Sequence, residues 1–382
     1  SHTFHALAVI DPIFQKAMKK AEELSGPAAR EICLMCHAPT TNVTADFDLR
    51  LPISSEGVTC SFCHSLTALD LSRQNNRFTN DLSRLSVDSD SKHIEGHHSE
   101  NHELTTSSRF CGGCHEWINP MGLKLLTTLS EWRESPYAAD GVTCQKCHMP
   151  EGPVKEGPGG GAKTMRSSNL HFQSGGHSQA RLIAAAEMEV EAKIDGEEIV
   201  VEAVVTNRKA GHKLPTGIPT RKMKLHVDLF DREGKILQTQ QKIYGRIITD
   251  ADGAVLEDVT DLFLLGAREI DDNRIAPREE RRERFLFPRT AGHNFYLVEA
   301  SLEYEILTPL LSTKALRFDV DRKRIPLSLS GEDSAKEPAG TRTSSTTVPL
   351  LIIAGIFLAV TAVMIHWMKK GTGGRQGRER KE

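Results

Sequence analysis

Cys33-Leu34-Met35-Cys36-His37 is the first of four copies of one five-residue pattern in this chain. The other three are Cys60-Ser61-Phe62-Cys63-His64, Cys111-Gly112-Gly113-Cys114-His115 and Cys144-Gln145-Lys146-Cys147-His148. Two thiols separated by two residues can bond to the two vinyl groups of one haem, and the next histidine then lies against the iron. The four copies use all eight cysteines. We therefore expect four covalently bound haem c groups.

The alternative is structural zinc, because paired C-x-x-C elements also form sites in which four thiolates hold one tetrahedral ion. Such sites do not need a histidine directly after every second cysteine, whereas all four pairs here have one. The pattern thus favours haem over zinc or disulfides. Because no cysteine is left over, we expect no disulfide once the haems are attached.

Length and composition limit the remaining possibilities. A chain of 382 residues is long enough for two domains. The formal net charge of −3 gives no indication of a nucleic-acid partner. Residue 1 is serine, which suggests numbering that begins after a removed export signal. Because haem is joined to C-x-x-C-H outside the cytoplasm, we expect the haem region to be extracytoplasmic.

The segments around the motifs predict a mostly helical or irregular domain packed around its haems. Asp11-Pro12 is typical of a helix start, and a face made of Ile13, Ala17, Ala21 and Leu24 precedes a stop at Gly26. Residues 65–109 show little periodicity and predict a long connection. Gly57-Val58-Thr59-Cys60 and Gly141-Val142-Thr143-Cys144 resemble each other, which suggests duplication of a two-haem unit.

Histidines outside the motifs are candidates for the second ligand of each iron. The candidates are His2, His5, His93, His97, His98, His102, His171, His177 and His212. We favour His5, one or both of His98 and His102, one of His171 and His177, and His212, since histidine ligation keeps haem potentials low. Each could instead be an ordinary loop residue. For His212, a plain inter-strand turn and a loop that reaches the haem domain are equally supported.

From about residue 187 the pattern changes to strict alternation. Apolar and polar residues alternate over 188–194, 223–229 and 295–306, and Asp195-Gly196 predicts a hairpin turn. These segments predict an antiparallel β-sandwich. His226 falls on the polar face of its strand and is expected to be a surface residue.

The C-terminal part predicts a membrane anchor. Residues 326–347 are rich in Ser, Thr, Gly, Pro and charge, which is typical of a flexible tether. Residues 348–368 contain no Asp, Glu, Lys or Arg and would form a helix about 31 Å long, enough for one transmembrane span. The basic tail, 369–382, then places the C-terminus in the cytoplasm and the haems outside. A buried core helix is the alternative.

The expected organisation is a mixed one with five parts. They are a tetrahaem domain (1–180), a β-sandwich domain (181–325), a flexible linker (326–347), a single transmembrane helix (348–368) and a cytoplasmic tail (369–382).

Several runs resemble the tetrahaem cytochrome c-554-like family of multihaem c-type cytochromes. They are the four motifs, Cys36-His37-Ala38-Pro39, residues 131–138 and residues 141–150. The loop at 210–217 resembles one in β-domains fused to such cytochromes. The resemblance implies mostly bis-histidine haems in stacked and crosswise pairs that act as an electron relay. It also implies that His37, His64, His115 and His148 are the proximal ligands.

The expected function is that of a membrane-anchored, extracytoplasmic tetrahaem cytochrome. It would relay electrons between redox protein partners, in a respiratory chain or to extracellular acceptors, as a carrier rather than an enzyme. The alternatives are an oxidoreductase of nitrogen or sulfur compounds with one open haem site, and a subunit of a larger cytochrome oligomer or complex.

Overall fold

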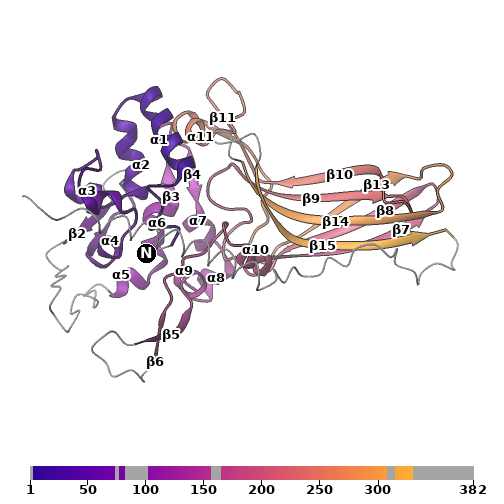
Figure 1. Ribbon diagram of the computed structural model, residues 1–382, viewed down its shortest axis with the longest axis horizontal. Helices are drawn as coiled ribbons and strands as arrows, with labels where there is room; N and C mark the ends of the chain where they lie inside the picture. The colour runs from indigo at the N-terminus through magenta and orange to yellow at the C-terminus, as the bar shows by residue number, and fades with distance from the viewer. Residues whose placement is uncertain (1–2, 74–76, 82–101, 156–164, 308–314, 330–382) are drawn as a thin grey trace, which may run out of the picture. The chain divides into compact units, whose positions relative to one another are not determined.

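The computed structural model describes residues 3–73, 77–81, 102–155, 165–307 and 315–329 (Figure 1). Several predicted features lie outside these residues, namely His2, His93, His97, His98, most of the tether, the apolar segment 348–368 and the basic tail. Among the helices that are described, none combines the length and the apolar character that a membrane span requires.

Short helices make up most of the N-terminal region, as the sequence predicts. They are α1 (Pro12–Ser25), α2 (Ala28–His37), α3 (Thr41–Thr44), η1 (Pro52–Ser55), α4 (Cys60–His64), α5 (His102–Thr106), α6 (Ser108–His115), α7 (Thr128–Arg133), α8 (Pro136–Ala139), α9 (Cys144–His148) and α10 (Gln179–Ala185). The helices α2, α4, α6 and α9 each end at the histidine of one motif. A helical turn places residues three apart on the same face, so each motif's two thiols project together.

Helix α1 begins and ends where the sequence predicts, but its buried face is different. The Asp11 carboxylate accepts from the backbone N–H groups of Ile13 and Phe14, and Gly26 ends the helix. The buried residues are Phe14, Met18 and Ala21, whereas Leu24 is 55% exposed. The predicted face is therefore wrong by about one residue, because Phe14 and Met18 pack in one cluster with Val9 and Leu34.

Three short hairpins join these helices. They are β1 (Leu66–Leu69) with β2 (Phe78–Asn80), β3 (Glu116–Ile118) with β4 (Lys124–Thr127), and β5 (Glu151–Lys155) with β6 (Met165–Asn169). The first hairpin and α5 lie within 65–109, where the sequence shows little periodicity. A strand of three or four residues is too short to show a period, so the sequence gives no sign of these elements.

Two antiparallel sheets form the second region. One has the order β10-β9-β14-β15 and the other has the order β13-β8-β7. The strands are β7 (Ala186–Asp195), β8 (Glu198–Asn207), β9 (Arg221–Phe230), β10 (Ile236–Tyr244), β13 (Glu280–Pro288), β14 (Phe295–Ile306) and β15 (Leu316–Ser328). The predicted antiparallel β-region is thus confirmed, including the hairpin at Gly196. Strand β15 continues three residues past 325, the predicted end of this domain.

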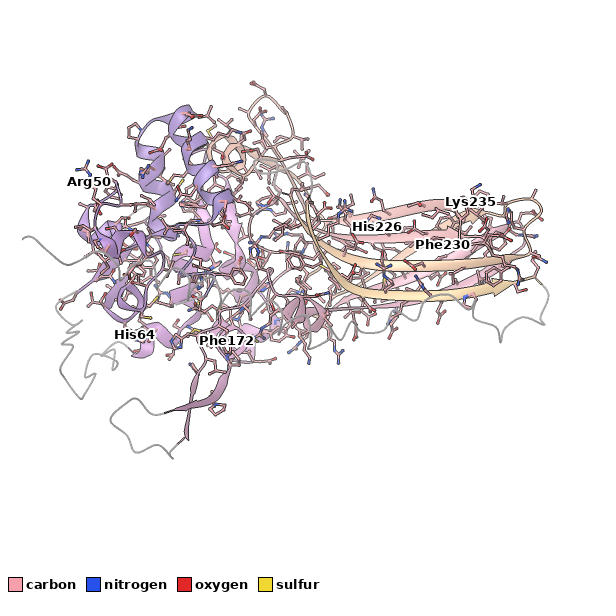
Figure 2. All side chains as sticks on the ribbon, viewed as in Figure 1. Arg50, His64, Phe172, His226, Phe230 and Lys235 are labelled. Carbon is pink, nitrogen blue, oxygen red and sulfur yellow. The ribbon has the colours of Figure 1, made fainter. Side chains whose placement is uncertain are left out.

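One apolar core lies between the two sheets, which face each other in Figure 1. Val201 of β8 and Phe285 of β13 contribute from one sheet, while Leu225 of β9 and Val298 of β14 contribute from the other. Side chains that alternate with them point outward, as the period of two requires. His226 is one of these outward residues, 3.8 Å from Glu303, and Figure 2 shows it on the sheet.

An extension of the β-region packs against the N-terminal region. It consists of β11 (Arg246–Thr249), α11 (Val259–Leu265) and β12 (Arg268–Asp272). Ile248 and Leu262 of this extension share one buried cluster with Met35, Trp117 and Leu125. Because burial of apolar surface stabilises both sides of such a contact, the two regions are expected to unfold together.

Candidate haem-binding sites

The four motifs lie close together around the third one. Cys36 lies near enough to Cys114 for each thiol to shift the pKa of the other, and the same holds for Cys111 and Cys144. Cys63 is near enough to act electrostatically on both cysteines of the third motif. Haems attached at these positions would therefore be near neighbours.

Three of the four motif histidines face a second histidine. The ring centroids are 6.2 Å apart for His115 and His5, 6.1 Å for His64 and His171, and 6.4 Å for His148 and His212. Figure 2 shows His64 at the end of α4. All three partners are among the candidates that the sequence analysis favours.

These separations fit two imidazoles that share one iron. A ring nitrogen lies about 2 Å from a bound first-row metal, so two opposed imidazoles have centroids about 6 Å apart. Two protein ligands suffice for haem iron because the porphyrin supplies the other four, whereas structural zinc takes four protein ligands. Within the described residues, no group of three or more His, Cys, Asp or Glu side chains is arranged to hold a metal ion. The separations of the paired histidines therefore fit haem.

Hydrogen bonds fix the orientation of most of these rings. The Nδ1 atoms of His37, His148, His171 and His212 lie 3.1, 2.8, 2.9 and 2.9 Å from backbone carbonyl oxygens. A carbonyl can only accept, so Nδ1 carries the proton and Nε2 keeps its lone pair for a metal. The same bond fixes the direction in which Nε2 points.

Gln173 orients His5 in the same way, since its Oε1 lies 2.6 Å from Nδ1 of His5. This role of Gln173 is not predictable from the sequence. Gln173 does not lie next to a haem motif and belongs to no helical or alternating pattern, so nothing in the sequence distinguishes it from an ordinary loop glutamine. Its backbone has a φ of 48°, which is uncommon for a residue other than glycine.

The protein environment favours the neutral form of three of the four motif histidines. Burial lowers the pKa of His37 and of His148 below the usual value. Burial, and then His5 and Arg221, lower the pKa of His115 to about 3. Neutral imidazole is the form that binds a metal.

The first motif differs from the other three. The ring of His37 stacks on Phe14, with centroids 3.9 Å apart, and none of the histidines whose side chains the structure describes has its ring opposite it. His177 stacks on Phe4 at 5.1 Å instead of facing a motif histidine. His102 is the first residue of α5, and His98 lies outside the described residues. The second ligand at this site therefore stays a prediction.

Comparison with known proteins supports the haem interpretation. The family described as "Cytochrome c554 and c-prime" matches residues 1–65, which include the first two motifs. This match confirms the family resemblance over that segment. No curated protein matches the chain.

Two solved structures are similar to the chain to very different degrees. A penta-heme cytochrome c552 from Thermochromatium tepidum is 23% identical, with a TM-score of 0.64, over 85% of this chain and 94% of its own. At this identity the likeness shows a shared fold, which here includes both regions. The C-terminal domain of wzt is 12% identical, with a TM-score of 0.22, over 43% of this chain and 84% of its own. That score is too low to carry an argument.

Proposed function

We propose that this multihaem c-type cytochrome relays single electrons between redox protein partners through four haems. The haems are attached at Cys33/Cys36, Cys60/Cys63, Cys111/Cys114 and Cys144/Cys147. The observation that carries the proposal is the pairing of His115, His64 and His148 with a second histidine at 6.1–6.4 Å. Two histidine ligands close both faces of an iron, which favours electron transfer over substrate binding.

The protein residues hold and tune each site. When bound, haem supplies reversible one-electron chemistry at its iron. His5, His171 and His212 would complete the coordination at three of the haems, and the hydrogen bonds at Nδ1 keep these rings in position. At a site with two histidine ligands, no ligand would have to leave or enter when the oxidation state changes, so little rearrangement would accompany electron transfer there.

The arrangement of the motifs provides a path for the electrons. The third motif lies beside the first at Cys36 and Cys114 and beside the fourth at Cys111 and Cys144. Electrons would therefore pass through the third haem when they cross the domain. The donor and acceptor proteins would dock at other haems.

We further propose that the chain is anchored to the membrane, with its haems on the extracytoplasmic side. The support is the apolar segment 348–368 and the basic residues after it. Protease added from the outer face should release the haem-containing region and leave the tail with the membrane. Loss of the tail instead would show the opposite orientation.

A second function is also testable, because His37 has no ring opposite it among the histidines whose side chains the structure describes. An open iron at this site would bind small molecules, as in an oxidoreductase of nitrogen or sulfur compounds.

Two measurements test the proposed function. The intact mass of the unfolded chain should exceed the polypeptide mass by four haems, because thioether bonds survive denaturation. A carbon monoxide difference spectrum of the reduced protein should show four unreactive, low-spin haems. Binding of one CO per chain would favour the oxidoreductase over the simple electron relay. A measured mass without haem would contradict both proposed functions.

A further inference from the structure

A buried carboxylate joins the haem region to the β-region beside the fourth site. Glu131 of α7 has a side chain that is 4% exposed, and its pairing with Arg274 is 2.6 Å long. Its oxygens also accept hydrogen bonds from Thr127 and Thr216, both at 2.7 Å, and from the backbone N–H of Lys213 at 3.1 Å. Glu131 thus uses both oxygens on groups from two regions of the chain.

Two of these contacts belong to the loop that presents His212. The loop, residues 211–217, leaves β8 and returns to β9. Glu131 holds it at Lys213, the residue directly after His212, and again at Thr216. On the other side of the loop, Asn207 Nδ2 donates to the carbonyl of His212 at 2.9 Å.

The rest of the network neutralises the charge of Glu131 and fixes its position. Asp272 holds the Arg274 guanidinium with hydrogen bonds of 2.8 and 2.9 Å. Lys213 Nζ pairs with Asp272 at 2.8 Å, so the loop is attached to the network a third time. A buried carboxylate that is paired and fully hydrogen-bonded has little freedom to move.

We propose that Glu131 is the positioning residue of the fourth haem site and holds His212 opposite His148. The proposal rests on the proposed function, in which these two histidines share one iron. The backbone N–H of Lys213 is the group next to His212, so a displacement of this hydrogen bond moves the imidazole. A carboxylate suits this role because its two oxygens accept several bonds at once.

The test compares Glu131→Ala and Glu131→Gln with Glu134→Ala. Glu134 directly follows the same helix and is exposed, which makes it a matched control. The readouts are the high-spin haem fraction and the number of CO molecules bound per reduced chain. Relative to the unmodified protein, we expect Glu131→Ala to bind one additional CO per chain and Glu131→Gln to bind a fraction of one additional CO. Glu134→Ala should bind no additional CO. Added imidazole should restore the low-spin spectrum of Glu131→Ala.

His212→Ala in the same assay separates this inference from the proposed function. If His212→Ala gains one CO and Glu131→Ala gains none, the positioning role is wrong and the ligand assignment stands. If neither variant gains CO, the assignment of His212 is wrong as well.

The double variant, Glu131→Ala with His212→Ala, distinguishes positioning of His212 from a general structural role of Glu131. It should bind no more CO than His212→Ala alone, since both changes act on one iron. CO binding at more than one haem would show general loosening and would overturn the proposal. Should Glu131→Ala fail to fold, Glu131→Gln, which keeps the shape of the side chain, provides the same comparison.

Discussion

Gly57→Ala should open the third haem site, although Gly57 precedes the second motif. Gly57 has a φ of 72°, and a Cβ there would lie 2.6 Å from the carbonyl oxygen of Ala6 and 2.9 Å from that of His5. Ordinary contact begins at 3.4 Å, so the backbone at Ala6 must retreat by about 0.8 Å. The neighbouring Val58 N–H also donates to the His5 carbonyl, at 3.0 Å. The displacement therefore reaches the histidine that faces His115.

Gly141→Ala is the matched control, since it changes the equivalent glycine before the fourth motif. Gly141 has a φ of 69°, and nothing lies within 4 Å of a Cβ at this position. Both variants incur about 1–2 kcal/mol for a left-handed backbone with a side chain. Only Gly57→Ala adds the backbone clash, which is expected to cost about 1–3 kcal/mol more.

Two assays distinguish the pair of glycine variants. Denaturant unfolding should show a larger loss of stability for Gly57→Ala than for Gly141→Ala. The spectrum of Gly57→Ala should gain one high-spin haem, because a ligand must be held within about 0.5 Å of its working position. Equal stabilities and unchanged spectra in both variants would refute the role of Gly57 in placing His5.

Three further outcomes are expected. His171→Ala should convert the second haem to a high-spin, CO-binding form, whereas His226→Ala should leave every haem spectrum unchanged. Arg274→Leu leaves a buried carboxylate without its partner and should lower the free energy of unfolding by about 3–5 kcal/mol. Arg278→Leu breaks an exposed ion pair and should lower it by much less. Equal losses of stability for the two variants in denaturant titrations would contradict this. Burial alone would raise the pKa of Glu305, but Lys224 and Arg317 hold that pKa below its usual value of 4.5. The contribution of Glu305 to stability is therefore present above pH 4.5 and is lost as the pH falls further. Glu305→Gln should flatten this acid-dependent loss of stability, and an unchanged pH profile would disprove it.

The sequence predicts the local features of this protein well. The helix cap at Asp11, the hairpin at Gly196 and the strand 295–306 all depend on residues that are neighbours in the chain. The motif histidines are identifiable because their cysteines precede them directly.

The sequence does not predict which histidines face one another. Nine candidates compete for the second positions, and the choice depends on packing between distant segments. The buried face of α1 is predicted wrongly for the same reason, since Phe14 stacks on the distant motif histidine His37. Glu131 lies in a run noted only for its resemblance, and its partners Thr216 and Arg274 come from another region.

The opposed histidines have a topological consequence once each pair shares an iron. The pairs are His5 with His115, His64 with His171, and His148 with His212. Each closes a ring that runs through the backbone and one haem, and the three rings overlap along the sequence. A single cut in the backbone between residues 5 and 212 therefore falls inside at least one ring. The two fragments stay joined by an iron–nitrogen bond, so the nicked protein would migrate as one particle until a denaturant or acid displaces the histidine.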